Sequence, residues 1–252
     1  MKDSIKFNKI VTYLMPILSG VVIYLLFLFL YLIKNNSLAF PNPNDIIKET
    51  FNLFIKFDTY KSIGLSLIRL LLSIIISLIL SFILAVLSYR FVYFEKFINP
   101  YITIFRTLPL ASIIVLLIIT VGMNLSSYVV TILVLAPLIY QNIYDGLINV
   151  SKDITDAYKI DSYFNLKVLF KLLVPEILPN IKTALISCVG LGFKVLVMAE
   201  FISGKNNSIG YSLKDAYQNN IEMVYVYAWS LILIIMSLLI TKLCDILKEK
   251  KV

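Results

Sequence analysis

The chain contains no histidine among its 252 residues. This absence excludes Ser-His and Cys-His catalysis and any metal site that needs an imidazole ligand. The phosphate-binding loop GxxxxGK[ST] is also missing, so ATP hydrolysis would require another polypeptide. The two cysteines, Cys188 and Cys244, are too far apart in the sequence for a disulfide framework or a metal-ligand spacing. We therefore expect no catalytic residue, no metal and no cofactor in this chain.

Charged residues are scarce, at 15% of the chain against 60% hydrophobic residues. Several apolar runs reach the roughly 18 residues that a transmembrane helix needs. The composition predicts an all-α polytopic membrane protein with one domain over residues 1–252, because spans and short connections use nearly the whole chain. The net charge of +8 comes from Lys and Arg scattered near the ends of these runs, which is typical of membrane topology and not of nucleic-acid binding. The first run has no small-residue cleavage site, so we expect it to remain as a signal anchor.

About six transmembrane helices are predicted, over approximately Ile10–Ile33, Ser62–Leu87, Leu108–Val121, Ser127–Gly146, Pro179–Ile202 and Met223–Leu243. A polar loop containing Pro41 and Pro43 should follow the first span, and a basic turn over residues 89–106 should precede the third. The third span is short, so either it includes flanking residues to cross the bilayer or it lies inside the bundle. An even number of spans places both termini on one side, where Lys and Arg are more frequent. The positive-inside rule therefore makes the termini and the segment 151–179 cytoplasmic.

The segment Ser151–Pro179 is the most polar long stretch between the apolar runs. It begins with a serine suited to cap a helix, and acidic residues follow in the first turn. We expect two short helices arranged as an elbow, the second ending at Pro175. Ile154, Ala157 and Tyr158 give the first helix one narrow apolar face. Such a face needs a partner surface to dock into.

This segment resembles the cytoplasmic coupling loop of ABC-importer permeases. The family motif is E-A-A, three residues, Gly, nine residues, then I-x-L-P, and the spacing fits without a gap. The corresponding residues here are Asp156, Ala157 and Tyr158 for E-A-A, Ser162 for the glycine, Leu172 for the isoleucine, and Val174 and Pro175 for L-P. Only Ala157 and Pro175 match by letter. Tyr158 departs from the usual small residue, and Ser162 favours a helix cap where the family has a glycine turn.

Other parts of the chain resemble the nitrate, sulfonate and taurine branch of these permeases, so that the resemblance covers roughly residues 60–245. The matching stretches are Ser66–Leu71, Phe105–Ile114, Gly190–Gly204 and Asn207–Ala216. The resemblance implies the type I importer permease fold, a second permease copy, and two ATP-binding-cassette ATPase subunits that bind ATP and Mg²⁺. It also implies a prokaryotic cell membrane, an extracellular solute-binding protein and a small solute such as a sulfonate, nitrate or a vitamin precursor.

Two other function classes are weighed against this one. A secondary transporter or channel should show an internal repeat with broken helices, or a row of titratable groups in the spans, and we find neither. A membrane-embedded enzyme is disfavoured by the missing histidines and by the lack of clustered intramembrane carboxylates.

Three charged residues are predicted inside the spans: Arg69, Lys194 and Glu200. Charges in the bilayer are costly, so they should face the bundle interior or water. One interpretation is a cationic lining that attracts an anionic solute. The interpretation that we favour is that Glu200 and span-end carbonyls neutralise both cations and hold the second span to the fifth.

Small residues occur together on the fifth predicted span, where Ser187 and Gly190 are three positions apart. They permit close helix packing, which is the commoner role, or they leave a wall for a solute path.

Overall fold

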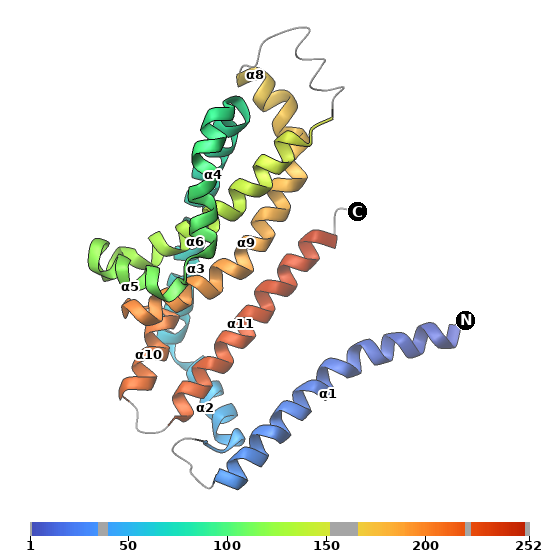
Figure 1. The fold of residues 1–252 in the computed structure, drawn as a ribbon. Coiled ribbons are helices and arrows are strands. Elements are labelled where there is room, and N and C mark those ends of the chain that lie inside the picture. The colour runs from blue at the N-terminus through green and yellow to red at the C-terminus, as the bar shows by residue number, and fades with distance from the viewer. Residues whose placement is uncertain (1, 35–39, 152–165, 220–222, 250–252) are drawn as a thin grey trace.

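The computed structural model describes residues 2–34, 40–151, 166–219 and 223–249. Every element in these ranges is helical, as predicted, and Figure 1 shows the bundle that they form. The elements are α1 Lys2–Lys34, α2 Pro43–Ile55, α3 Phe57–Arg90, α4 Val92–Thr107, α5 Leu110–Val121, α6 Met123–Ile148, α8 Leu166–Val168, the π-helix η1 Leu169–Leu173, α9 Val174–Ser203, α10 Ile209–Asn219 and α11 Val224–Glu249.

Among the described residues, four helical segments are long and apolar enough to cross a membrane: α3, α6, η1 with α9, and α11. A fifth span is formed if α4 and α5 are counted together, although the two helices meet at a bend of 105°. The stretch Leu18–Ile33 of α1 is apolar but shorter than a full span. The six predicted spans fall on α1, α3, α5, α6, α9 and α11, and α5 reaches span length only together with α4.

The centre of the bundle is the junction of α3, α6 and α9, and it depends on small side chains. One face of α3 is a stripe of buried hydroxyl residues: Ser66, Ser73, Ser77, Ser81 and Ser88. Small residues let helix backbones approach closely where lipid gives no hydrophobic driving force. Gly192 on α9 shows how tight the junction is, because a Cβ there would lie 2.9 Å from Leu70 Cδ1 and 3.0 Å from Leu135 Cδ1.

Pro137 lies inside α6 and faces this junction. Proline removes one helical hydrogen bond, and hydroxyl groups of neighbouring helices commonly satisfy the backbone around it. Two serines of α3 donate to carbonyls of α6 that precede the proline, although neither is the Leu133 carbonyl that Pro137 leaves without its helical donor. Ser81 Oγ donates to the Ala136 carbonyl at 2.7 Å, and Ser77 Oγ donates to the Ile132 carbonyl at 3.5 Å.

Two expectations about connections are wrong. The polar loop after the first span contains α2, in which Pro43 occupies the first turn and Asn42 caps the helix by accepting from Asn44 N at 3.0 Å. Proline at the start of a helix loses no intrahelical bond, so Pro43 begins a helix instead of lying in a loop. The basic turn predicted over residues 89–106 is mostly α4, which carries Pro100 inside it.

The boundary predicted between the elbow and the fifth span is also wrong. The helix does not end at Pro175, and Pro179 lies inside α9 and not at its start. The chain is helical from Leu166 to Ser203, and the π-helix η1 directly before Pro175 accommodates this proline without a break. Val174 N, the last amide before Pro175, bonds to the Leu169 carbonyl five residues earlier.

Candidate functional site

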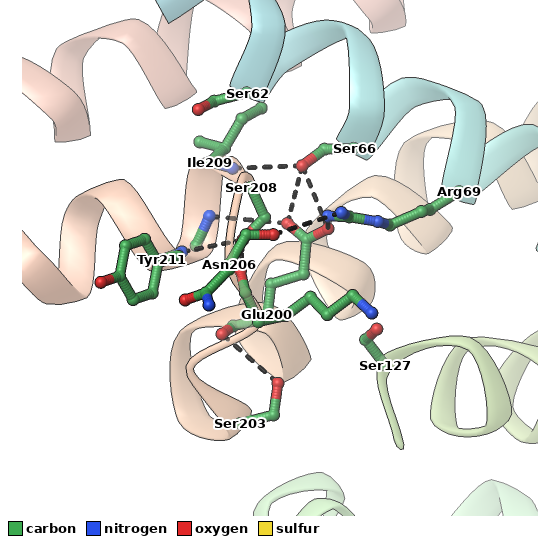
Figure 2. A network of polar contacts seen from close by, with 12 residues as sticks. Ser62, Ser66, Arg69, Ser127, Glu200, Ser203, Asn206, Ser208, Ile209 and Tyr211 are labelled. Atoms are coloured by element: carbon green, nitrogen blue, oxygen red, sulfur yellow. Dashed lines mark hydrogen bonds and ion pairs between the residues drawn. The ribbon is translucent and has the colours of Figure 1, made fainter. Parts of the chain in front are cut away.

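A buried polar network joins α3, α9 and the start of α10 at one end of the bundle (Figure 2). We call it the Glu200 network, and its members are Ser66, Arg69, Glu200, the Asn206 carbonyl, Ser208, Ile209 N and Gly210 N. The local sequence explains how the chain reaches it. Gly204 ends α9 in the left-handed conformation, with φ of 69°, which glycine adopts without steric cost. The chain then turns back so that α10 begins beside the end of α9 (Figure 1).

The ion pair of Arg69 and Glu200 is the central contact of this network. Arg69 Nη1 lies 2.9 Å from Glu200 Oε1, and the two side chains are 8% and 0% exposed. Arg69 Nη2 also donates to the Asn206 carbonyl at 3.3 Å. A charge buried this fully is stable only when it is paired and hydrogen-bonded. The pair therefore holds the second predicted span to the fifth.

The Glu200 carboxylate also accepts hydrogen bonds from two uncharged groups. Ser66 Oγ lies 3.0 Å and 2.8 Å from the two carboxylate oxygens, and the Gly210 amide donates to Oε2 at 3.5 Å. The carboxylate thus sits at the N-terminus of α10, where the helix dipole favours negative charge. A Cβ at residue 210 would lie 2.4 Å from the Phe201 amide nitrogen. Only glycine allows α10 to start this close to α9.

The start of α10 is fixed by its own cap and by α3. Ser208 Oγ accepts from the Tyr211 amide at 2.9 Å, and Ser66 Oγ accepts from the Ile209 amide at 3.1 Å. Ile209 is fully buried beneath the turn. These contacts orient α10 against α3 and α9, so the Glu200 network joins the three helices.

Lys205 joins the loop after α9 to the first turn of α6. Its Nζ donates to the carbonyl and to the side-chain oxygen of Asn124 at 3.1 and 3.0 Å. Burial of the ammonium lowers the pKa of Lys205, the nearby charge of Arg69 lowers that pKa further, and Glu200 opposes both effects.

Lys194 is not part of the Glu200 network, contrary to our expectation that Glu200 would neutralise both cations. Lys194 is exposed on α9 and has no ion pair with any residue that the structure describes. Lys194 and Glu200 are six positions apart, so a helix with about 3.6 residues per turn points them in different directions. The structure therefore separates a paired cation, Arg69, from an unpaired one.

The packing role expected for Ser187 and Gly190 is also not found within the chain. Ser187 is exposed, and a Cβ added at Gly190 would meet no atom within 4 Å. Both residues share the outward face of α9 with Lys194. Gly192 is the glycine of this helix that makes the close approach.

Four residues of the predicted coupling motif, Asp156, Ala157, Tyr158 and Ser162, lie outside the described residues. Of the other three, Leu172 in η1 and Pro175 in the first turn of α9 are exposed, and Val174 at the start of α9 is half-buried. Their coupling role remains a prediction. Across the parts of the chain that the structure describes, no group of His, Cys, Asp and Glu could hold a metal ion.

Sequence reasoning missed Ser66, Ser208 and Gly210. Two signals were available. Ser66 precedes Arg69 by three positions on a helix, which places both on one face. The sequence Asn207-Ser208-Ile209-Gly210 has a capping residue two positions before a glycine, which indicates the start of a closely packed helix.

Comparison with known proteins agrees with this fold. The family model for the inner membrane component of binding-protein-dependent transport systems matches residues 77–250, and the chain belongs to this family. It is therefore a permease component of ABC-type importers and not an enzyme, which confirms the family predicted from the sequence.

Individual relatives are more distant. The chain is 32% identical over 79 residues to the bicarbonate transport system permease protein CmpB of Synechocystis sp., covering 31% of this chain and only 28% of that protein. It is 22% identical over 184 residues to the putative aliphatic sulfonates transport permease protein SsuC of Bacillus subtilis, covering 73% of this chain and 66% of that protein. A solved amino acid ABC transporter with histidines has a TM-score of 0.60 at 16% identity, covering 81% of this chain and 96% of that one.

Proposed function

We propose that the chain forms the translocation path of a prokaryotic ABC importer for a small solute of the sulfonate, nitrate or vitamin-precursor kind. The observation that carries the proposal is the family match over residues 77–250 in a chain that has no phosphate-binding loop of its own. Relatives that are named for bicarbonate and aliphatic sulfonate transport support a small anionic solute.

The complete importer that we propose contains two copies of this permease and two ATPase subunits, which bind ATP and Mg²⁺. An extracellular solute-binding protein delivers the solute. Both termini and the segment 151–179 face the cytoplasm, where residues of that segment, together with Leu172 and Pro175, couple the ATPases to the spans. Closure of the ATPase pair moves the two coupling segments and switches the path between its two open sides. The chain acts as a single transmembrane domain throughout.

The Glu200 network supports the proposed role of α9 in coupling the ATPases to the spans. The Glu200 network fixes α3, α9 and α10 to one another, so a movement applied near Leu166 is transmitted along one continuous helix to Ser203. A long helix with a locked far end is suited to carry a displacement over its length.

Co-expression tests the proposal. The chain is purified alone and together with its ATPase subunits, and both preparations are reconstituted into vesicles with the solute-binding protein. We expect no ATP turnover by the chain alone, and ATP-dependent uptake by the complex with two permeases and two ATPases. ATP hydrolysis by the isolated chain, or uptake by the isolated chain driven by an ion gradient, would contradict the proposal.

A further inference from the structure

A groove between α9 and α11 carries the unpaired lysine described above. Its volume is about 380 Å³, and it is lined by residues of α9, α10 and α11. We call it the Lys194 groove. Its polar side chains are Lys194 of α9 and Ser237 of α11, and no carboxylate is found among its lining residues within the described part of the chain.

The remaining lining is apolar. Val197 and Met198 contribute from α9, Leu213 from α10, and Leu233 and Ile234 from α11. The groove thus joins one cation and one hydroxyl to an extended hydrophobic surface. Small-molecule sites have this composition: mostly apolar walls with a few polar groups that fix the orientation of the ligand.

The depth of Lys194 limits what can neutralise it. Lys194 lies nine positions before Ser203 in α9, which places it about 14 Å along the helix from that end. The hydrocarbon core of a bilayer is about 30 Å thick, so Lys194 lies near its middle. A cation there must face water or meet an anion. Arg69 meets Glu200, whereas Lys194 has no ion pair among the described residues and is exposed to the groove, so it is available to an anion that enters from solution.

We infer that the Lys194 groove binds an organic anion that carries a short apolar tail, with the acidic group at Lys194 and Ser237 and the tail against Leu233 and Ile234. This inference rests on the proposed transport function, because a solute path is what brings a water-soluble anion to this depth. It narrows the solute class to amphipathic anions. An inorganic anion such as bicarbonate would satisfy the lysine but would leave the apolar wall without a partner.

An anionic lipid has the same chemistry, an acidic group with an apolar tail. Its phosphate remains at the membrane interface, however, and Lys194 lies near the centre of the core. We therefore commit to a soluble anion and separate the two sources by experiment.

The chain itself provides the reporter. Trp229 is its single tryptophan; it lies buried on α11, one turn before Leu233. The full-length permease in neutral phosphatidylcholine nanodiscs is titrated with butanesulfonate, methanesulfonate and bicarbonate while Trp229 fluorescence is recorded. We expect saturable binding of butanesulfonate, and at least tenfold weaker binding of the other two. An unchanged signal with butanesulfonate, or equal affinity for bicarbonate, would overturn the inference.

Variants test the lysine directly. Lys194→Gln should weaken butanesulfonate binding at least tenfold, and Lys194→Arg should restore most of it. Lys61→Gln removes the same charge from an exposed position of α3 and should have no effect. If Lys194→Gln does not fold, Ile234→Phe replaces it: by narrowing the apolar wall, it should reduce the preference for butanesulfonate over methanesulfonate. Parent-like binding in either variant would overturn the inference.

The lipid alternative and the proposed function are tested separately. Native mass spectrometry of nanodiscs that contain phosphatidylglycerol would reveal a lipid retained by the parent and lost in Lys194→Gln, and that result would overturn the inference.

The proposed function is tested in the complete importer. ATP-dependent uptake that is unchanged by Lys194→Gln would show that the groove is not part of the translocation path, and the proposed function would still hold. If no solute at all is taken up by the parent importer, the proposed function fails, while the nanodisc titration still decides whether the groove binds an organic anion.

Discussion

Arg69 and Glu200 are 131 positions apart in the sequence, yet Nη1 of one lies 2.9 Å from Oε1 of the other. The contact joins two spans at a point where water is excluded from both side chains. Its consequences for stability differ from those of an exposed pair. When one partner of a buried pair is removed, the other becomes an uncompensated charge.

The first prediction concerns this pair. Arg69→Ala and Glu200→Ala should each lower the free energy of unfolding by about 3 to 5 kcal/mol, because each leaves its partner charged and buried. The double variant should lose less than the two losses added together. The measurement is unfolding of the purified permease in mixed micelles, followed by Trp229 fluorescence.

Lys56 and Glu49 provide the matched control, since their 3.8 Å contact is largely exposed on the lysine side. The same cycle on this pair should give a coupling of less than about 1 kcal/mol. Strictly additive losses at Arg69 and Glu200 would count against a coupled pair.

The second prediction concerns the glycine at the start of α10. Gly210→Ala should destabilise the permease by about 1 to 3 kcal/mol, because the new methyl group would overlap backbone atoms that cannot rotate away. A Cβ at residue 210 would lie 2.4 Å from the Phe201 nitrogen and 2.6 Å from the Val197 carbonyl oxygen. Gly190→Ala is the control, since its Cβ meets nothing within 4 Å. Thermal unfolding monitored by size-exclusion chromatography distinguishes the two, and equal melting temperatures would refute the close approach of α10.

The third prediction compares two serines of the buried α3 stripe. Ser81→Ala removes the 2.7 Å bond to the carbonyl before Pro137 and should cost about 0.6 to 1.7 kcal/mol, the range for hydrogen bonds between membrane helices. Ser73 is equally buried, but its Oγ has no hydrogen-bond partner among the described residues, so Ser73→Ala should be neutral or stabilising. The measurement is the free energy of unfolding of Ser81→Ala and of Ser73→Ala, each relative to the parent. A larger loss for Ser73→Ala would show that the assigned bonds are wrong.

Much of the fold was predictable from the sequence because long apolar runs have one stable outcome in a bilayer. The contact between Arg69 and Glu200 was predictable too, from opposite charges in the same half of two spans. The connections were not. Pro43 and Pro175 were interpreted as breaks, but one begins a helix and the other is accommodated by a π-turn. A proline marks a lost hydrogen bond, and only the surrounding contacts determine whether the helix stops.

The error over Lys194 has a geometric cause. Counting residues from a span end gives the depth of a side chain but not its direction around the helix. Arg69 and Lys194 have similar predicted depths, yet Arg69 points toward Glu200 (Figure 2) and Lys194 points into the groove beside α11. The start of α10 was missed for a related reason. Its short helix lies in a polar stretch whose position depends on Ser66, a residue more than 140 positions away.

The fourth prediction uses the pH dependence of Lys205. Its pKa in the folded permease is below the ordinary value, chiefly because burial disfavours the ammonium. Between that lowered pKa and the unfolded value of about 10.4, the unfolded chain binds more protons than the folded one. The free energy of unfolding of the parent should therefore rise with pH in this alkaline window, relative to Lys205→Met. The measurement is the difference between the two melting temperatures across the window. A difference that is constant, or that moves in favour of Lys205→Met, would contradict the lowered pKa.

The last prediction tests the coupling segment through Ala157, which the family motif places on the apolar face of the first elbow helix. A docking helix transmits force only if it fits closely in its groove, and a small side chain permits that approach. Ala157→Arg should leave insertion and folding intact, because the proposed site faces the cytoplasm and not lipid. It should weaken association with the ATPase subunits and abolish uptake, since an overpacked contact and a desolvated unpaired charge each cost roughly 1 to 3 kcal/mol or more.

Asp156 provides the comparison at the neighbouring position. A carboxylate in the first turn of a helix contributes only about 0.3 to 1 kcal/mol through the helix dipole, so Asp156→Asn should be far less disruptive than Ala157→Arg. Both variants are compared with the parent in a pull-down of the ATPase and in an uptake assay, using membranes with matched expression. If Ala157→Arg binds the ATPase and transports solute like the parent, residues 151–179 do not couple the two subunits, and another part of the permease must transmit the movement of the ATPases.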